Sequence, residues 1–360
     1  PPEYFKKAGL MHESVSKIRS SIMLIGPLIH GLDNFSFAHS GGCKMGNRTI
    51  EAHRSALEVL GAKIVTKNDC YEISSSKLRS GRVVMYESSD TATENILMAA
   101  ALVPGKTVIG FASPNYQVQE VCFLLEKCGV KINGIGTSTL EIHGVARIDK
   151  PIEYWNSEDP IESMMFISAA ITTGSKLTVK KCPIDFLKLE LLKLKKMGLR
   201  FNQTQEYFSE NGRTRLVDLE IFPSKLKAPP DKIHAQPYPG INTDNLPFFV
   251  PIATQSSGTT LIHDWMWENR AIYFTELNRL GANVTLADPH RVFISGPTPL
   301  KPAQVVCPPA LRPAVIILIA MLAAPGSSIL RNVYSIKRGY EEVAERLNKI
   351  GAKIQIIRDL

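Results

Sequence analysis

Residues 40–48, with the sequence SGGCKMGNR, combine the side chains best suited to chemistry in this chain. The adjacent glycines let the backbone bend sharply, and the thiol of Cys43 follows them. A thiol beside a cation such as Lys44 can lose or lend a proton near neutral pH, and Arg48 offers a planar fork of donors for a phosphate or carboxylate. The stretch predicts a reactive loop at an anionic substrate, with a glycine-rich turn around an inert cysteine as the alternative.

The elements that must position this loop recur along the chain. A helix end, a glycine and a short apolar strand repeat five times at a spacing of about 70 residues, which indicates repeated supersecondary units. A glycine in the left-handed conformation ends a helix and turns the chain into a strand. The expected capping glycines are Gly61, Gly129, Gly198, Gly281 and Gly351.

A second series of glycines marks the turn between an apolar helix and the strand that follows it: Gly105, Gly174, Gly258 and Gly326. Each unit therefore contains two helices and is predicted as β-α-β-α-β-β, with helices beneath sheets. A linear solenoid is the alternative, but units of this length are long for one. The predicted fold class is α/β (α+β), in compact pseudo-symmetric domains.

Three aspartates, Asp90, Asp159 and Asp244, lie at or near the expected start of an apolar helix. Aspartate caps free backbone N–H groups at such positions, and capping alone would account for all three. The matching position in the last unit is near Ala310, where the cap is absent. If the units share one centre, several positive helix ends face one cleft and favour a phosphorylated ligand.

Composition places the chain among ordinary globular proteins, with 44% hydrophobic and 21% charged residues, and its 360 residues favour two domains. The net charge of +8 suits an anionic substrate. Basic residues are scattered, and their densest group, Lys193, Lys195 and Lys196, is expected to be a solvated helix face. No interleaving of aromatic and basic residues supports nucleic-acid binding.

The six cysteines form no C-x-x-C pair and no histidines lie at zinc spacing, so neither a disulfide framework nor a metal site is expected. This usage fits a reducing cytoplasm. The longest apolar run, residues 314–324, is too short to span a bilayer and is predicted to be a buried helix, so we expect no membrane association. The chain opens with two prolines, and its first methionine is Met11, so we expect a fragment of a longer protein.

These motifs resemble the enolpyruvyl transferases, and most closely the UDP-N-acetylglucosamine 1-carboxyvinyltransferase branch. The resemblance extends over nearly the whole chain. It is carried by KIRSSIMLIGPL (17–28), SGGCKMGNR (40–48), TATENILMAAAL (91–102), INTD (241–244), WENRAIYFTELNRLGA (267–282) and KRGYEEVAERLNKIGAKI (337–354).

The resemblance implies a two-domain inside-out α/β barrel, each domain built from three units and closing over substrate. Five of the six units are visible here. The missing one would be the N-terminal unit, together with a first strand that joins the second domain. We therefore expect residues 1–150 to form the catalytic-loop domain with two units and residues 151–360 to form a second domain with three. The boundary is expected within residues 145–159.

The resemblance also implies the chemistry: transfer of the enolpyruvyl group of phosphoenolpyruvate to the 3-hydroxyl of UDP-N-acetylglucosamine, with release of phosphate. Cys43 matches the cysteine that donates a proton and can form a covalent adduct with phosphoenolpyruvate. Asp244 matches the aspartate that pairs with the sugar hydroxyl as a base. The arginines that match the phosphoenolpyruvate site are Arg48, Arg270, Arg312 and Arg338.

Contacts with the UDP-sugar are implied for residues scattered along the chain, with Met266 acting through its backbone only. They are Arg19, Arg48, Thr49, Glu51, Ser89, Thr243, Asp244 and Met266. The reaction needs no cofactor, and we expect a monomeric cytoplasmic enzyme of peptidoglycan synthesis, with the associated roles in cell wall biogenesis, cell shape, cell cycle and cell division.

Several positions depart from the family pattern. An N-terminal Lys-Asn pair has no counterpart, the usual Pro-Val-Asp-Leu is replaced by residues 49–52 (TIEA), a lysine is replaced by Glu87, and a second catalytic-site aspartate is replaced by Ala310. Glu51 can still accept from uracil, whereas Glu87 would repel a diphosphate. The alternative function is therefore a divergent or vestigial member that binds a sugar nucleotide without turnover. The 5-enolpyruvylshikimate-3-phosphate synthases are a weaker match because that branch does not rely on the loop thiol.

Overall fold

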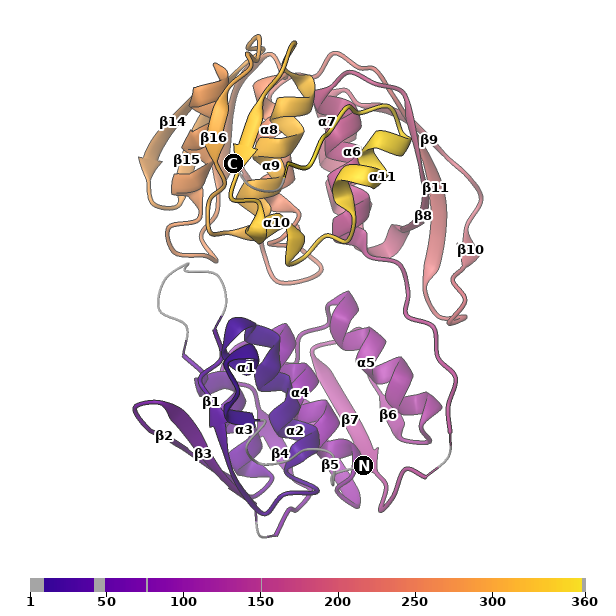
Figure 1. Cartoon of the computed structure of the whole chain (residues 1–360). Coiled ribbons are helices and arrows are strands. Elements are labelled where there is room, and N and C mark those ends of the chain that lie inside the picture. Colours follow the sequence, from indigo (N-terminus) through magenta and orange to yellow (C-terminus); the bar gives the residue numbers. More distant parts are fainter. Residues whose placement is uncertain (1–9, 42–48, 76, 150, 358–360) are drawn as a thin grey trace. The chain divides into compact units, whose positions relative to one another are not determined.

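The computed structural model describes residues 10–41, 49–75, 77–149 and 151–357 (Figure 1). These residues form two compact units. The described part of the first unit comprises residues 10–41, 49–75, 77–149 and 151–157, together with residues 237–239. That of the second comprises residues 158–236 and 240–357.

The first unit contains two repeats. The elements of the earlier one are α1 (Glu13–Lys17), η3 (Arg19–Leu24), α2 (Ile25–Leu28), β1 (Asn34–Ala38), α3 (Glu51–Val59), β2 (Ala62–Thr66) and β3 (Cys70–Ser75). Those of the next are β4 (Arg82–Val84), α4 (Asp90–Ala101), β5 (Gly105–Gly110), α5 (Tyr116–Lys127), β6 (Lys131–Asn133) and β7 (Thr139–Gly144).

The second unit contains three repeats. The first has α6 (Pro160–Thr172), β8 (Leu177–Pro183), η4 (Ile184–Phe186), α7 (Lys188–Met197), β9 (Arg200–Gln203), β10 (Tyr207–Phe208) and β11 (Arg215–Phe222). The next has β12 (Ile233–His234), η5 (Leu246–Phe248), α8 (Phe249–Thr254), β13 (Gly258–His263), η6 (Ala271–Leu280), β14 (Asn283–Asp288) and β15 (Arg291–Gly296). The last has β16 (Gln304–Val306), α9 (Leu311–Ala323), β17 (Ile329–Arg331), α10 (Tyr334–Lys337) and α11 (Val343–Lys349).

The sheet topology confirms the predicted repeat and the mixed helix-and-sheet class. The sheets β4-β5-β7-β6 and β12-β13-β15-β14 have the same order, with one parallel pair followed by antiparallel pairs. Sheet β1-β3-β2 has the same order without the leading strand. One expectation is wrong: residues 352–357, after the last capping glycine, form no strand, so the described part of the last sheet contains only β16 and β17.

The capping glycines adopt the positive φ that the repeat predicted, and the second series has positive φ as well, with values over both series from 62° at Gly174 to 110° at Gly105. At Gly198 φ is 108°, and the N–H of Leu199 donates to the carbonyl of Leu194 at 2.9 Å, which closes a Schellman turn. The helix that ends at Gly281, η6, is a 3-10 helix rather than the expected α-helix. The capping glycines thus end the second helix of each repeat.

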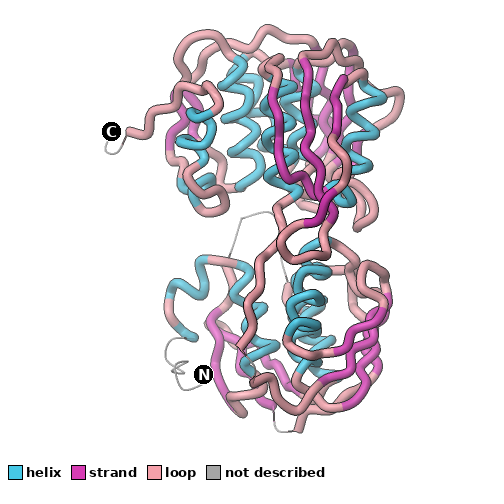
Figure 2. Tube along the Cα trace, turned by 90° about the vertical axis from the view of Figure 1, so that its right-hand side faces the viewer, coloured by secondary structure: helices cyan, strands magenta, loops and turns pink. Residues whose placement is uncertain are grey.

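Apolar helices form the centre of the second unit. Helices α6, α8 and α9 contact one another, and most of their residues are buried. The predicted buried helix at residues 314–324 is therefore confirmed as most of α9, and Figure 2 shows the helices of this unit side by side, with strands around them. Among the described residues, no helix combines the length and the apolar character that crossing a bilayer requires.

In the first unit, α4 is the central helix, and Asn95 ties it to the preceding segment. Its Oδ1 accepts from the backbone N–H of Gly26 at 2.7 Å, and its Nδ2 donates to the carbonyl of Ile22 at 3.1 Å. A Cβ at residue 26 would overlap the carbonyl oxygen of Asn95, so only glycine allows α2 to approach α4 this closely.

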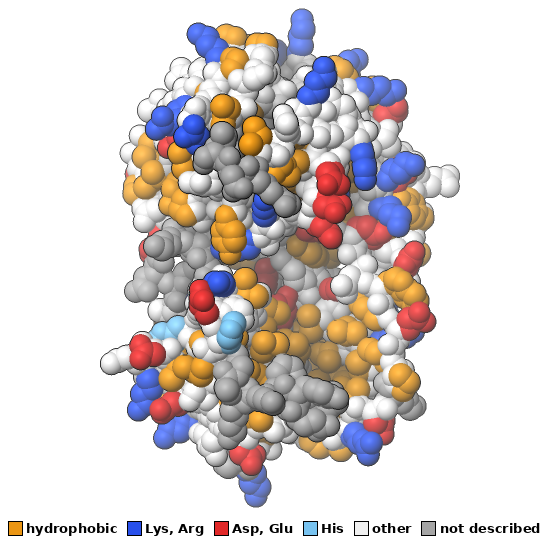
Figure 3. All heavy atoms as spheres, viewed as in Figure 1, with side chains coloured by type: hydrophobic (Ala, Val, Ile, Leu, Met, Phe, Trp, Pro, Cys, Tyr) orange, Lys and Arg blue, Asp and Glu red, His pale blue; other side chains and the backbone are white. Residues whose placement is uncertain are grey.

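Charged side chains are distributed over the surface, as the sequence predicted. On the face shown in Figure 3, Lys and Arg lie among Asp and Glu without forming one dense patch. Lys195 and Lys196 are exposed on α7, which confirms that this basic group is a solvated helix face.

An unusual ionisable group lies inside the first unit. Glu94, on α4, is only 4% exposed, and burial, reinforced by the nearby charge of Asp90, raises the pKa of its carboxyl to about 7. The folded chain therefore retains a proton that the unfolded chain releases above its ordinary pKa of 4.5. The contribution of Glu94 to stability consequently falls as the pH rises from 4.5 to about 7.

Replacement of Glu94 by glutamine should remove this loss. We expect Glu94→Gln to raise the free energy of unfolding by about 3 kcal/mol at pH 8, with no such gain at pH 4. Urea unfolding at the two pH values measures the difference. The control, Glu58→Gln on the exposed side of α3, should change stability by less than about 0.5 kcal/mol at either pH. An equal effect of Glu94→Gln at both pH values would contradict the burial argument.

Candidate active site

The carboxylate of Asp244 lies between two guanidinium groups of the second unit. Its Oδ1 is 3.5 Å from Nη1 of Arg270, and its Oδ2 is 3.2 Å from Nη2 of Arg312. Asp244 lies in the turn before η5, Arg270 directly precedes η6, and Arg312 lies in the first turn of α9. The fold therefore brings together three of the residues that the sequence singled out, from two different repeats.

Arg270 is held by a buried aspartate that the sequence analysis missed. The side chain of Arg270 is 1% exposed and that of Asp264 is fully buried, with Nε–Oδ2 at 2.5 Å and Nη2–Oδ1 at 2.9 Å. Burial raises the pKa of Asp264, while the charge of Arg270 opposes the rise. Nη2 also donates to the carbonyl of Thr243 at 2.6 Å. Nε and Nη2 are thereby occupied, so Nη1 is the nitrogen that Arg270 directs to Asp244.

Arg312 has an aromatic partner that the sequence analysis did not predict. Its Nη1 donates to the hydroxyl of Tyr340, and its guanidinium lies 5.4 Å from the centre of that ring. Burial alone would lower the pKa of Arg312, but the charge of Asp244, followed by Tyr340 and Asp159, raises it overall. Burial raises the pKa of Tyr340 to about 12, so its hydroxyl stays protonated near neutral pH. The pair presents a permanent cation beside a neutral hydroxyl.

The three aspartates expected at helix starts, Asp90, Asp159 and Asp244, differ in their hydrogen-bond partners. Asp159 is the N-cap of α6, since its Oδ1 accepts from the N–H of Ile161 at 2.8 Å, as predicted. The capping role was wrong for Asp90, because Ser89 is the extended N-cap of α4 and Asp90 instead accepts from Ser113 and Asn115.

The capping role was also wrong for Asp244. Its carboxylate bonds arginines, and η5 begins at Leu246 with no side-chain cap. Ala310 precedes α9 and, as predicted, supplies no cap.

The other predicted residues of the second unit occupy the same repeats. Thr243 directly precedes Asp244, and half-buried Met266 lies between Asp264 and Arg270 in the chain. Arg338 is half-buried at the C-terminal end of α10, two residues before Tyr340.

The predicted residues of the first unit lie on separate elements. Arg19, at the start of η3, donates to the carbonyl of Thr49 at 2.6 Å. Burial lowers the pKa of Arg19, and the charges of Tyr71 and Glu87 oppose that shift, so Glu87 acts as a partial counter-charge.

Two further predicted residues of this unit have structural contacts of their own. Glu51, in the first turn of α3, pairs with Arg54 at 2.6 Å, and Ser89 caps α4. Cys43, Lys44 and Arg48 lie outside the described residues.

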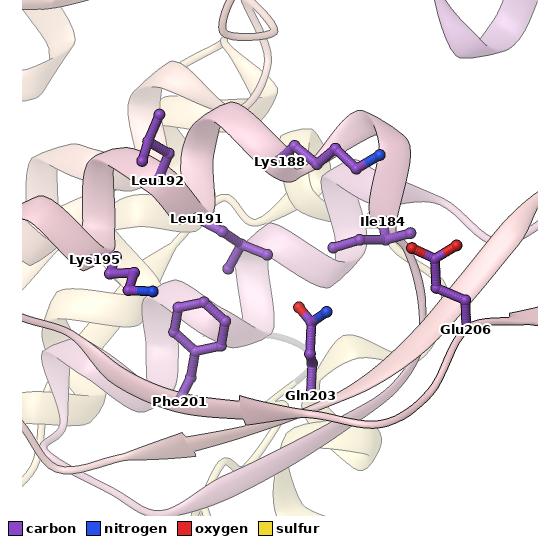
Figure 4. Close-up of a pocket in the computed structure, with 8 residues that line it drawn as sticks. All are labelled: Ile184, Lys188, Leu191, Leu192, Lys195, Phe201, Gln203 and Glu206. Carbon is purple, nitrogen blue, oxygen red and sulfur yellow. The ribbon is translucent and has the colours of Figure 1, made fainter.

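A separate pocket of about 220 Å³ lies between α7 and β9, and none of Asp244, Arg270 and Arg312 lines it (Figure 4). Apolar side chains of both elements and two lysines line it. Its residues are Ile184, Lys188, Leu191, Leu192, Lys195, Phe201, Gln203 and Glu206.

Comparison with known proteins identifies related sequences. The family model of EPSP synthase (3-phosphoshikimate 1-carboxyvinyltransferase) matches residues 5–347. The UDP-N-acetylglucosamine 1-carboxyvinyltransferase of Borrelia garinii is 36% identical over 343 residues, which cover 95% of this chain and 78% of the relative. The enzyme of the same name from Treponema denticola is 35% identical over 362 residues, which cover 98% of this chain and 82% of that relative.

Solved structures share the fold. The enolpyruvyl transferase NikO from Streptomyces tendae superimposes with a TM-score of 0.77 at 22% identity, over 93% of this chain and 77% of that one. EPSP synthase from Acinetobacter baumannii gives a TM-score of 0.72 at 17% identity, over 94% of this chain and 78% of the EPSP synthase chain. These likenesses confirm the expected inside-out α/β barrel architecture.

The buried pair of Arg270 and Asp264 generates a test of stability. Asp264→Ala should lower the free energy of unfolding by about 3 to 5 kcal/mol, because it leaves a buried guanidinium without its main counter-ion. Urea denaturation measures the loss. Glu276→Ala, which breaks the exposed pair of Glu276 and Arg279, should cost at most about 1 kcal/mol. Equal losses in the two variants would show that Asp264 does not hold Arg270 as described.

Proposed function

The chain belongs to the EPSP synthase family of enolpyruvyl transferases, and from this premise we propose that it transfers the enolpyruvyl group of phosphoenolpyruvate to UDP-N-acetylglucosamine. The acceptor is the 3-hydroxyl of the sugar, and inorganic phosphate is released. Relatives at 35–36% identity with that activity in their names support the choice of acceptor. The observation that carries the proposal in this chain is the carboxylate of Asp244 held between Arg270 and Arg312.

The reaction needs an acid, a base and cations. A proton is added to the methylene carbon of phosphoenolpyruvate, and the sugar oxygen bonds to the adjacent carbon while its own proton passes to a base. Loss of a methyl proton then re-forms the double bond as the carbon–oxygen bond to phosphate breaks. Cations stabilise the phosphate and carboxylate charges throughout.

Asp244 is the proposed base, and its surroundings suit that role. The two guanidinium groups fix the direction of its carboxylate, and a positioned carboxylate can accept the proton of a hydroxyl within hydrogen-bond reach. When the anionic substrate binds, the same guanidinium groups can donate to its phosphate or carboxylate oxygens. The buried pair of Arg270 and Asp264 supports this role, because it fixes the cation through a contact within the protein.

The remaining roles are proposed from the sequence. Cys43 is the proton donor to phosphoenolpyruvate, and Arg48 and Arg338 hold its phosphate. Arg19, Thr49, Glu51, Ser89, Thr243 and Met266 contact the UDP-sugar. In a cell this activity would be the first committed step of peptidoglycan synthesis, in the cytoplasm, with a monomeric enzyme and consequences for cell wall, cell shape and cell division.

The alternative, a member that binds the sugar nucleotide without turnover, is not favoured. Glu87 and Ala310 depart from the family pattern, yet Glu87 serves as a counter-charge to Arg19 and the partners of Arg312 are supplied by Asp244 and Tyr340. The carboxylate of Asp244, which is the proposed base, and its pairs with Arg270 and Arg312 support an active enzyme.

Phosphate release from phosphoenolpyruvate tests the function and the base together. We expect release that depends on UDP-N-acetylglucosamine, and a fall in kcat of about 10² or more in Asp244→Asn, because the amide cannot take the proton. The matched control is Glu276→Gln, which changes a partly exposed acid on η6 that pairs with Arg279, and this variant should retain full activity. Release without the sugar nucleotide, or undiminished turnover in Asp244→Asn, would refute the proposal.

The role of the thiol is tested separately. Cys43→Ser should remove most turnover, since a hydroxyl lends a proton far less readily than a thiol, with a loss on the order of 10² in kcat. Binding of UDP-N-acetylglucosamine, measured by calorimetry, should be retained. Unchanged turnover in Cys43→Ser would eliminate the acid role while leaving the role of Asp244 standing.

A further inference from the structure

A buried carboxyl of helix α7 holds both ends of the turn that carries Asp244. Glu190 is 2% exposed, and its Oε1 accepts two hydrogen bonds. The backbone N–H of Asn242 donates at 3.2 Å, and the side-chain Nδ2 of Asn245 donates at 2.9 Å. Thr243 and Asp244 lie between these two contacts, so one oxygen atom fixes the turn on either side of the proposed base.

The turn is rigid within itself. Oδ1 of Asn242 accepts from the N–H of Asp244 at 2.8 Å, and the carbonyl of Asn242 accepts from the N–H groups of Asn245 and Leu246 at 3.0 and 3.1 Å. A displacement of residue 242 therefore moves Asp244 with it. The carbonyl of Thr243 binds Arg270, so the turn is held by Glu190 through residues 242 and 245 and by Arg270 through residues 243 and 244.

Packing alone does not explain a carboxyl at this position. The other buried residues of α7 are Leu191, Leu194 and Met197, and an apolar side chain would fill the same space without desolvating a charge. Burial raises the pKa of Glu190, and the bonds from Asn245 and Asn242 oppose that rise. Asn245 is itself fully buried, and its Oδ1 has no partner among the described residues. The two polar residues are thus buried at a cost that their mutual hydrogen bond offsets.

We propose that Glu190 is a positioning residue for the transfer reaction: by accepting from Asn242 and Asn245 it holds Asp244 at the distance from Arg270 and Arg312 that the reaction requires. The catalytic part of this inference rests on the function proposed above. The structural part, that Glu190 fixes the turn, does not depend on it.

Two substitutions separate the hydrogen bonds from the packing. Glu190→Leu keeps the volume and removes the acceptor, whereas Glu190→Gln keeps a carbonyl oxygen that can accept both bonds. We expect Glu190→Leu to lower kcat by about tenfold to a hundredfold, the scale of a small misplacement of a catalytic group, with the affinity for UDP-N-acetylglucosamine changed by less than about threefold. Glu190→Gln should stay within about twofold of the unsubstituted chain.

The control is Leu194→Ala, which removes buried packing from the same helix without touching the turn. It should lower stability but retain kcat at a temperature where it is folded. A loss of kcat in Leu194→Ala equal to that in Glu190→Leu would overturn the proposal, because a general loosening of α7 would then account for both. Normal kcat in Glu190→Leu would overturn it as well.

Hydrogen exchange gives a readout that needs no turnover. In Glu190→Leu the amides of residues 242–246 should exchange at least about tenfold faster, while Glu190→Gln and Leu194→Ala leave them protected. If Glu190→Leu does not fold, Asn245→Ala, which removes one of the two donors, should show the same changes at smaller size. If the unsubstituted chain releases no phosphate, the function fails, and exchange alone decides whether Glu190 fixes the turn. Unchanged exchange in folded Glu190→Leu refutes the inference.

Discussion

Two guanidinium groups, that of buried Arg270 and that of partly buried Arg312, impose the main electrostatic constraint on the second unit. A cation without an anionic partner is costly away from water, so Arg270 and Arg312 each require a counter-ion that the fold can place. Asp264 serves Arg270 at 2.5 Å from within the same loop, and Asp244, which lies earlier in the repeat that carries Arg270, faces both cations. The carboxylate and the two guanidinium groups are consequently held in place by contacts within the protein itself, as electrostatic stabilisation of an anion requires.

The repeat explains why these groups meet. Helices α6, α8 and α9 come from three successive repeats and pack against one another, so the segments at their starts converge. Asp159 caps α6, Thr243 and Asp244 precede the helical segment η5 and α8, and Arg312 lies in the first turn of α9. The charges of Asp159 and Asp244 both act on Arg312, which shows that equivalent positions of the repeats lie close together. Because the core is pseudo-symmetric, equivalent positions of successive repeats lie close together, and their charged side chains form a cluster.

Polar groups placed inside the units have specific partners. Asn95 clamps α4 to the segment of Ile22 and Gly26, and Glu190 clamps α7 to the turn of Asp244. In both cases an apolar residue would suffice for packing, but it would not fix the register between two elements. Glu94 differs, because its burial raises the pKa of a carboxyl that stands beside the charge of Asp90.

The sequence alone determined the repeat, the conformation of its glycines and the family. Those features are local or periodic: a capping glycine needs positive φ wherever a helix must turn into a strand, and the series could be read without knowing any contact. The sequence also indicated Asp244, Arg270 and Arg312 one by one, through short motifs. Nothing in the sequence indicated that Asp264, Tyr340 and Glu190 support these residues. The sequence also predicted that Asp90 and Asp244 cap helices, whereas Ser89 caps α4 and no side chain caps η5. Only the tertiary structure decides such contacts. Tyr340 and Glu190 lie tens of residues from their partners, and helix periodicity does not encode that pairing. Asp264 is near Arg270 in the chain, but it is buried only because other segments cover it.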